Sequence, residues 1–499
     1  MSSENPLEIP EITSIVASSL ASNDLASCLR VSRKWLALFL PHRWKSIKVG
    51  STRSLVGTGK PFLRFGPHPA DIHRHRHLIQ SLTMLGDLAG LDKYNYPNLR
   101  HLVVNYSDAE DPTRTIFLDL VEMFPQVVAL DLSSVKIERT TWLILSNHSH
   151  ITTLMLYDID IKSNVASEFW EACTKLECLE LRVVAFEGGT VPHDVMFVRL
   201  TKLVLWNTIG VDKAEQLSLI FHCPALKYFQ WGTFSENNEY DTDDDGTDDD
   251  EGDTHPIITD PIITNPIPDG FWPHLNNLMI NVHLHDTDVA SMLKGVGREH
   301  GGLIELNLYD CSFLDHSSRA LELHFSTLVC LSFVNFSVPS AVIRDILCSC
   351  PRLEDLSAWC VRVRDIVDCG PWVCQQLRRL ATCFRLQGGE QDLQHDLFER
   401  LSRLTHLESL TMHCIASATH SKDYFVAFRL ENGLGQLASL QQLKTLTFGG
   451  CSPQLSMKEV AWFKVHWTKL RMKGGPFHQE KQENDNLKAA MKLLGLLDV

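Results

Sequence analysis

The chain has 499 residues, of which 44% are hydrophobic, and a formal net charge of -15. Residues 235–253 hold eleven acidic side chains and no basic one, so the rest of the chain carries a net charge of only -4. A nearly balanced folded part excludes general nucleic-acid binders, which need a basic face to neutralise phosphates, while the apolar content suffices for a large core.

Three short helices are predicted in residues 1–48. Their apolar residues recur at helical spacing, as Ile12, Ile15, Val16 and Leu20, then Leu25, Cys28 and Leu29, then Val31, Trp35 and Leu38. Pro10 suits the first turn of the first helix, and Asn23 or Asp24 can cap the second. Pro41 is expected to close the third helix. Such a small group of helices has no substantial core of its own.

Residues 49–77 are predicted to be a linker. They include the basic run His73-Arg74-His75-Arg76-His77, which we interpret as exposed and to which we assign no metal or phosphate site. Helices that merely capped the following domain would not require such a link.

The template apolar-x-x-apolar-x-apolar recurs through residues 78–475. Its copies begin at Leu99, Val127, Ile151, Leu176, Leu200, Leu226, Leu275, Leu303, Leu328, Leu353, Leu377, Leu407 and Leu443, with a weaker copy at Leu78. Helical patterns lie between copies, for example in residues 116–124, 164–173 and 340–350. Each repeat is therefore a strand, a turn and a helix of about 25 residues. Such repeats stack into a curved solenoid with a parallel sheet on its concave side.

The interval from Leu226 to Leu275 is 49 residues, about twice the usual spacing. The surplus matches an acidic insertion at residues 235–270, which cannot bury enough apolar area to fold. We predict a disordered loop whose removal has little effect on folding.

A last helix is predicted in the C-terminal tail, residues 476–499. Its apolar residues recur at helical spacing, as Leu487, Ala490, Met491, Leu494 and Leu497. Asn484 and Asp485 precede them and can cap the start of the helix. We interpret this helix as a lid over the terminal repeat.

The repeat resembles the leucine-rich repeat of the cysteine-containing type, L-x-x-L-x-L-x-x-C. Leu303 to Cys311 match it at every anchor. Other copies place a small or apolar residue at the last position, as Val135, Ile159, Val184, Phe336 and Cys451. The resemblance covers roughly residues 78–472 and is specific in aggregate.

The N-terminal helices resemble the F-box, whose pattern is roughly L-P-x-E-I, a helix, D-L and then V-S-x-x-W. The matching segments are Ile9-Pro10-Glu11-Ile12, Asp24-Leu25 and Val31-Ser32-Arg33-Lys34-Trp35, followed by Trp44 and Ile47. The departures are Ile9 in place of Leu and a shortened link from Pro10 to Ile12.

An F-box joined to leucine-rich repeats resembles the substrate receptors of SCF-type cullin-RING ubiquitin ligases. The resemblance implies an α/β fold in which a three-helix F-box precedes a leucine-rich-repeat solenoid, with a curved parallel sheet inside and helices outside. It implies that the chain binds the ligase's adaptor subunit, through it the cullin, and a target protein. The implied adaptor-binding residues are Ile9, Pro10, Ile12, Ile15, Leu25, Val31 and Trp35.

Other functions stay open beside this one. The chain could be a leucine-rich-repeat scaffold or inhibitor without ligase association, or an enzyme hidden in the array. The N-terminal helices could serve only as a cap over the first repeat, because repeat arrays need polar-faced ends.

The side chain after the last anchor of each strand is predicted to lie partly exposed on the concave face. Aromatic residues at this offset are Tyr157, Trp206, Tyr309 and Trp359, and other copies place Asn105, Arg182 and His413 there. Large amphipathic rings are frequent binding anchors, so these four are predicted to bind the target. In the alternative interpretation, the rings only shield the edge of the strand layer.

No catalytic residue, cofactor or metal site is predicted. Phosphate-binding, nucleophile-elbow, dinucleotide and zinc-protease motifs are absent from the sequence. The 14 cysteines form no CxxC pair and are interpreted as reduced core thiols. With no signal-peptide pattern and no long apolar run, we expect a cytoplasmic or nuclear protein with no nucleic-acid or membrane partner.

Overall fold

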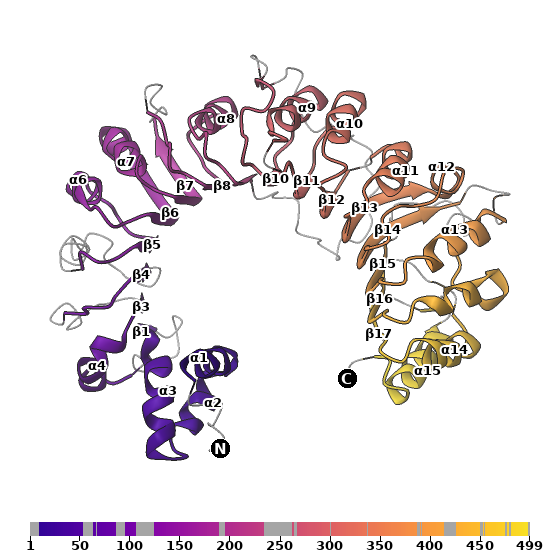
Figure 1. Cartoon of the computed structure of the whole chain (residues 1–499), viewed down its shortest axis with the longest axis horizontal. Helices are drawn as coiled ribbons and strands as arrows, with labels where there is room; N and C mark the ends of the chain where they lie inside the picture. The colour runs from indigo at the N-terminus through magenta and orange to yellow at the C-terminus, as the bar shows by residue number, and fades with distance from the viewer. Residues whose placement is uncertain are drawn as a thin grey trace, which may run out of the picture. The chain divides into compact units, whose positions relative to one another are not determined.

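The computed structural model divides the chain into two compact units, Met1–Ala225 and Leu226–Val499. It describes residues 9–52, 63–65, 67–85, 95–105, 124–188, 195–233, 262–263, 267–299, 301–336, 338–386, 390, 392–413, 426–449, 453, 455–474, 477–478 and 481–497. Each unit contains a row of strands with helices along one side (Figure 1). We call the sheet side opposite the helices the strand face.

The first unit begins with three helices, which we call the helical module, and continues as a sheet. Its elements are α1 (Pro10–Ser19), α2 (Ser22–Cys28), α3 (Arg33–Lys45), β1 (Ser46–Thr52), β2 (Leu63–Phe65), α4 (Pro69–His75), η2 (Arg76–Leu78), β3 (Ser81–Leu85), β4 (His101–Asn105), β5 (Ala129–Ser133), α6 (Arg139–Asn147), β6 (Thr153–Lys162), η3 (Ser163–Val165), α7 (Ala166–Cys173), β7 (Cys178–Glu187), β8 (Lys202–Trp206) and α8 (Lys213–Phe221). The strands β1 and β3 to β8 pair parallel in that order, and β2 pairs antiparallel with β1.

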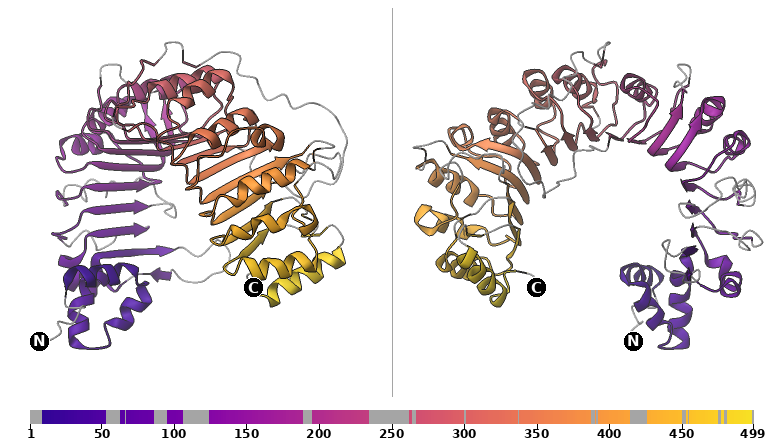
Figure 2. Two further views of the ribbon diagram at one scale, coloured as in Figure 1. Left: turned by 45° about the vertical axis from the view of Figure 1, so that its right-hand side comes forward. Right: turned by 180° about the vertical axis from the view of Figure 1, so that it is seen from behind.

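The second unit continues the same strand–helix alternation (Figure 2). Its elements are β9 (Tyr228–Gly232), β10 (Asn277–Asn281), α9 (Asp286–Gly295), β11 (Glu305–Tyr309), α10 (Asp315–Glu322), β12 (Cys330–Val334), α11 (Ser340–Ser349), β13 (Asp355–Arg362), α12 (Val363–Val367), β14 (Arg379–Arg385), α13 (Asp392–Ser402), β15 (Ser409–His413), η5 (Leu430–Asn432), η6 (Leu434–Ser439), β16 (Thr445–Gly449), α14 (Met457–His466), β17 (Arg471–Gly474) and α15 (Lys481–Leu493). Strands β9 to β17 pair parallel in chain order.

The repeat pattern predicts these strands correctly. Each clear copy of the template has a strand that begins two residues after its first anchor, and the weak copy at Leu78 corresponds to β3. The first anchors of the clear copies are all buried, whereas Leu78 is half-buried and Ile79 beside it takes the buried anchor position of β3. Anchors of neighbouring strands are in register, as in Leu82, Leu102 and Leu130. The template missed β17, whose anchors Leu470 and Met472 are buried in the same way. The predicted helices at 164–173 and 340–350 are confirmed as η3–α7 and α11.

A left-handed residue follows many of the strands. Residues with positive φ include Ser134, Asn207, Asp310 and Asn335, which stand directly after the strand end, and Asp158 and Val183, which interrupt the longer strands β6 and β7. The turn changes the chain's direction, so the next position in the repeat points into the core, as at Ile159, Val184 and Cys311. Asp and Asn tolerate this conformation, whereas a β-branched Val does so only with strain.

Three predicted helix boundaries are wrong. Asn23 and Asp24 lie inside α2, whose N-cap is Ala21, and the Asp24 carboxylate suits the positive end of the helix dipole there. Helix α3 continues through Pro41, and its last turn is held where Trp44 packs on His75 at 4.6 Å between ring centroids.

At the C-terminus, Asn484 and Asp485 lie inside α15, which begins at Lys481, and are not caps at its start. The Asn484 side chain instead accepts a hydrogen bond from the Phe477 amide at 2.8 Å. Asn484 therefore connects the terminal helix to the segment before it.

Two predicted irregular segments also change. The predicted linker 49–77 contains the end of β1, with β2, α4 and η2, so its described residues belong to the first unit's fold. In the predicted insertion 235–270, Ile262 and Ile263 donate backbone hydrogen bonds to Asp288 of α9, each at 3.0 Å. The acidic run 235–253 and most of the predicted helix 116–124 lie outside the described residues.

Candidate functional site

The helical module has a small core of its own. Ala17, Leu25 and Phe39 are buried, and the partly buried residues around them are Val16, Leu20, Cys28, Leu29, Trp35 and Leu38. The Trp35 ring contacts Phe39 at 5.4 Å between ring centroids. The Ser32 hydroxyl caps α3 by accepting a hydrogen bond from the Trp35 amide at 3.2 Å.

The structure separates the predicted adaptor-binding residues into two groups. Leu25, at 8% exposed, and the half-buried Trp35 form the module's core, so direct adaptor contact by Leu25 conflicts with its burial. Ile9, Ile15 and Val31 are exposed at 40%, 67% and 61%.

Two further predicted positions, and one residue the sequence analysis missed, complete the module. Pro10 begins α1 and Ile12 is half-buried. Leu36 is 41% exposed on α3. In the sequence, Leu36 is an apolar residue between Trp35 and Leu38, but it lies outside the set of apolar positions predicted for the third helix.

The module joins the sheet without a loop. Helix α3 ends at Lys45 and β1 begins at Ser46. β1 then pairs with β3 over five residues, and the Lys45 carbonyl accepts a hydrogen bond from the Gln80 amide at 2.9 Å. Ile47 and Val49 of β1 are buried, so the junction is part of the packed sheet.

On the first unit's strand face, two predicted target-binding rings flank a cation. Tyr157 of β6, Arg182 of β7 and Trp206 of β8 are paired in register across the three strands. Tyr157 is 47% exposed, and Arg182 and Trp206 are half-buried. We call these three residues the strand-end row, because each stands directly after the last buried anchor of its repeat; β6 and β7 themselves continue to Lys162 and Glu187.

A buried carboxylate lies behind the strand-end row. Glu180 accepts hydrogen bonds from Arg182, at 3.2 Å from Nε and 3.1 Å from Nη2, and forms an ion pair with Lys202 Nζ at 2.7 Å. Burial raises the pKa of Glu180, but Lys202 and Arg182 lower it more, so the pKa lies below its usual value. The two cations are therefore held in place at the surface.

A second carboxylate on the same face behaves oppositely. Burial and the negative charge of Glu180 raise the pKa of Asp131 on β5, and the positive charge of Arg182 opposes this only in part. Asp131 thus takes up a proton more readily than an exposed carboxylate.

In the second unit, the two predicted rings, Tyr309 and Trp359, do not flank a cation in this way. Tyr309 ends β11 opposite Val334, and Trp359 stands where the pairing of β13 with β14 shifts between Ser357 and Cys360. Tyr309 and Trp359 are both half-buried. At the same offset, Asn105 is half-buried and His413 ends β15.

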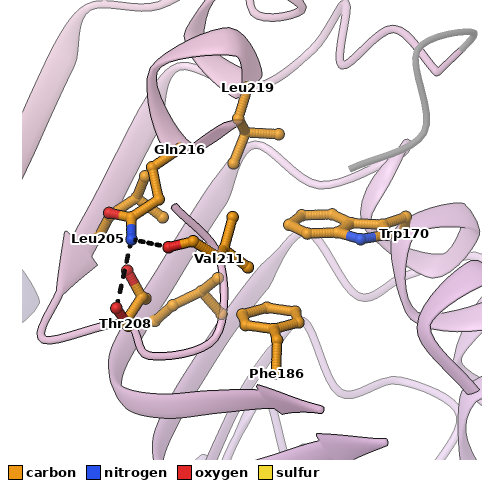
Figure 3. Close-up of a pocket in the computed structure, with 8 residues that line it drawn as sticks. Trp170, Phe186, Leu205, Thr208, Val211, Gln216 and Leu219 are labelled. Carbon is orange, nitrogen blue, oxygen red and sulfur yellow. Dashed lines mark hydrogen bonds between the residues drawn. The ribbon is translucent and has the colours of Figure 1, made fainter. Parts of the chain in front are cut away.

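The first unit also contains a cavity of about 10 Å³ between its strands and helices (Figure 3). Apolar side chains line most of it, and the amide of Gln216 donates hydrogen bonds to the carbonyls of Thr208 and Val211 at 3.2 and 2.8 Å. A space of this size holds at most about one water molecule, so it is a packing defect and not a ligand pocket.

Over the residues that the structure describes, no group of three His, Cys, Asp or Glu side chains is arranged to hold a metal ion. Within the same ranges, none of the helices combines the length and the apolar character needed to cross a bilayer.

No protein-family model matches the chain, and no curated protein matches it. Among solved structures, it is similar to an internalin from Listeria monocytogenes, with 13% identity and a TM-score of 0.34 over 76% of this chain and 82% of that one. It is also similar to a TLR13–ssRNA13 complex, with 12% identity and a TM-score of 0.41 over 79% of this chain. The match spans only 60% of the TLR13 chain.

Similarity at this level supports no argument about function, so the architecture is argued from the chain itself. The regular strand register, the buried anchors and the helices on one side of each sheet are those of a leucine-rich repeat. Both units of this α/β chain therefore have a leucine-rich-repeat solenoid architecture.

Proposed function

We propose that the chain is the substrate-recognition subunit of an SCF-type E3 ubiquitin ligase. In this proposal the helical module is an F-box that binds the adaptor and, through it, the cullin. The repeats bind a target protein and raise its effective concentration near the ligase's catalytic subunit. The chain itself performs no chemistry and works in the cytoplasm or the nucleus.

The observation that carries this proposal is the exposure of apolar side chains on the helical module. A helical cap is expected to turn its apolar residues onto the repeat that it covers. The module instead closes its core with Leu25, Phe39 and Trp35 and leaves Ile15 and Val31 more than half exposed. Exposed apolar side chains beside a closed core favour a protein partner at this place.

Target binding is proposed at the strand-end row. Tyr157 and Trp206 are rings of the kind that act as binding anchors, and Arg182 between them offers a cation whose position is fixed by Glu180. Tyr309 and Trp359 remain proposed contacts of the second unit.

Adaptor binding is tested with the double variant Ile15→Asp/Val31→Asp in the full chain. Two charges on exposed apolar positions should leave the fold intact and reduce co-purified adaptor and cullin by about tenfold or more. The matched control is Leu143→Asp/Val465→Asp, which places the same charges on exposed apolar positions of the repeats. Thermal unfolding of both variants checks that they remain folded.

Equal recovery of the adaptor by wild type and by the Ile15→Asp/Val31→Asp variant, with both folded, would contradict the ligase proposal. The second candidate function is a leucine-rich-repeat scaffold or inhibitor without ligase association. It is favoured if the chain recovers no adaptor while Tyr157→Ala still removes a specific protein partner.

A further inference from the structure

An extra residue in β13 brings two cysteines opposite each other. Strands β13 and β14 pair in register up to Ser357 and Ala381, and the pairing resumes at Cys360 and Cys383. Two residues of β13 therefore oppose one of β14, which is a β-bulge. Without the bulge, Trp359 and not Cys360 would stand opposite Cys383.

The two sulfur atoms are close enough to bond after a small movement. Cys360 Sγ lies 3.6 Å from Cys383 Sγ, and both thiols are reduced. Neighbouring strands lie about 4.8 Å apart, which is within the Cα separation that a disulfide accepts. Closing the sulfur distance to about 2.05 Å needs only side-chain rotation and a slight shift of the strands.

A small cavity on the core side of the bulge leaves some room for that shift. It has a volume of about 10 Å³ and is lined by residues that include Ala358, Val361, Thr382 and Phe384. The Thr382 hydroxyl is buried and has no hydrogen-bond partner among the described residues. Because successive side chains alternate along a strand, Cys383 lies on the opposite face of β14 from Thr382 and Phe384.

Two arginines lie beside the thiols. Arg362 and Arg385 are also in register, two residues beyond Cys360 and Cys383, and hence on the same face as the two thiols. Both are exposed, and neither forms an ion pair with a carboxylate within the described parts of the chain. The hydrogen bond with Cys383, opposed by burial and aided by Arg385 and Arg362, lowers the pKa of Cys360 to about 7.

A second close pair shows that proximity alone does not activate a thiol. Cys348 and Cys369 have sulfur atoms 3.2 Å apart, yet burial and Cys369 raise the pKa of Cys348 to about 12. Burial raises the pKa of Cys178 to about 11. A thiolate is the reactive form, so Cys360 should react before these cysteines at neutral pH.

We propose that Cys360 and Cys383 are a modification site for hydroperoxides, closing a disulfide between β13 and β14. The Cys360 thiolate attacks one peroxide oxygen, the O–O bond breaks, and the other oxygen leaves and is protonated, which gives Cys360 sulfenic acid. The Cys383 sulfur gives up its proton and attacks Cys360 sulfur. The S–O bond breaks, and hydroxide leaves with that proton as water. The two thiols lose two electrons, which the peroxide gains.

The first test treats the folded full-length chain with hydrogen peroxide at pH 7, blocks remaining thiols and maps disulfides by mass spectrometry. We expect a Cys360–Cys383 crosslink to form before any Cys348–Cys369 crosslink. Cys383→Ser should leave Cys360 as a sulfenic acid that a dimedone probe captures, and Cys348→Ser should leave the crosslinking rate unchanged.

The second test measures the rate of Cys360 alkylation by iodoacetamide against pH. The midpoint should lie near pH 7, as the lowered pKa of Cys360 requires. Arg385→Gln should raise the midpoint and slow alkylation at pH 7 by about fivefold. Arg403→Gln, which removes an exposed arginine directly after α13, is the matched control and should change neither.

Either of two results overturns the proposal. One is an alkylation midpoint for Cys360 at the value of an ordinary thiol, about 8.5. The other is a peroxide reaction in the folded chain that leaves Cys360 and Cys383 unlinked, or that links Cys348 to Cys369 first.

Discussion

Val183 has a backbone conformation that β-branched residues rarely adopt, with φ of 55°. It occupies the left-handed position that Asn207 fills in the next repeat, with φ of 54°. Val183→Asn should relieve this strain and raise the free energy of unfolding by about 1 kcal/mol. Urea unfolding followed by circular dichroism measures the change.

The reverse substitution provides a matched control. Asn207→Val places the strained residue type at the equivalent turn and should lower the free energy of unfolding by a similar amount. If both variants are less stable than wild type, side-chain packing and not backbone strain determines stability at these turns.

Asp286 of α9 caps the following helix of the second unit. Its carboxylate accepts hydrogen bonds from the amides of Leu314, His316 and Ser317, at 2.7, 2.9 and 3.0 Å, and from the Ser317 hydroxyl. Asp286→Ala leaves these donors unsatisfied and should cost about 2 kcal/mol of unfolding free energy at pH 7. Asp315→Ala removes an exposed acid from the same helix end and should cost less than about 0.5 kcal/mol.

The cap also makes a pH-dependent contribution. Burial raises the pKa of Asp286, but the Ser317 hydroxyl and the three amides outweigh it, so the folded pKa lies below the usual value of 3.8. A lowered folded pKa stabilises the protein above the unfolded pKa, and this contribution is lost as the pH falls through the folded value. The difference between wild type and Asp286→Ala should therefore shrink below about pH 4. A constant difference down to pH 3 would contradict this.

The helical module shows what the sequence could not decide at the scale of single residues. Periodicity identified Leu25, Trp35, Ile15 and Val31 as apolar positions of helices, and all lie in or beside helices. It did not tell core from surface, because a side chain that closes a small core and one that binds a partner are equally apolar. Only the packing of the three helices separates them.

At the scale of elements, the strand-end row leads to a prediction about target binding. Tyr157→Ala and Arg182→Ala should each reduce capture of the target by about tenfold, since anchors at the centre of an interface contribute most of its affinity. Tyr157 is the better test, because at 47% exposed its loss costs little packing. Quantitative mass spectrometry of co-purified proteins measures capture.

The control for the row is Leu143→Ala, on the helix side of the first unit. It should leave capture unchanged, with adaptor recovery equal in all variants. If Tyr157→Ala and Arg182→Ala capture as much as wild type, the target binds elsewhere.

We expect that only the acidic part of the insertion can be replaced without loss of stability. Exchanging residues 235–258 for a Gly-Ser segment of equal length should leave the unfolding midpoint unchanged, since loop composition contributes little to stability. Extending the exchange through Ile267 also removes the buried Ile267 side chain and the half-buried side chains of Ile262 and Ile263, whose backbone amides donate to the fully buried Asp288. Loss of this apolar burial should lower the free energy of unfolding by about 2 kcal/mol or more.

Asp288→Ala in the otherwise unchanged chain is the comparison for this prediction. It should also be destabilising, because it leaves the Ile262 and Ile263 amides without the carboxylate that accepts their hydrogen bonds. Loss of stability with the shorter exchange would mean that the acidic segment packs on the fold.

The strands could be predicted because every repeat buries its anchors in the same way. Local departures from the repeat could not be predicted. An ordinary strand end is what the sequence predicts for Ser357-Ala358-Trp359-Cys360. The bulge becomes evident only from the pairing of β13 with β14. Helix α3 continues past Pro41 and includes Trp44, which packs on His75, 31 positions later in the chain. A local sequence pattern does not contain such a contact.

At the scale of the whole molecule, the sequence predicts one array where the structure has two compact units. The template continues at Leu200 and Leu226 with a normal interval across the division at Ala225. The template records which positions are apolar and does not record how closely neighbouring repeats pack, so it cannot show where one compact unit ends and the next begins. In a repeat array, stability is local, because each repeat packs mainly on its neighbours.

Under the proposed ligase function, the direct passage from α3 into β1 bears on which lysines of a target would be modified. A docking element fixed to its sheet cannot swivel, so a bound target would be offered to the catalytic subunit in one orientation, and ubiquitin would accumulate on a few lysines. Inserting four Gly-Ser residues between Lys45 and Ser46 would turn this fixed joint into a flexible one. With adaptor and target binding unchanged, site mapping of the reconstituted reaction should then find ubiquitin spread over more target lysines. An unchanged lysine pattern would show that the orientation is set elsewhere in the ligase.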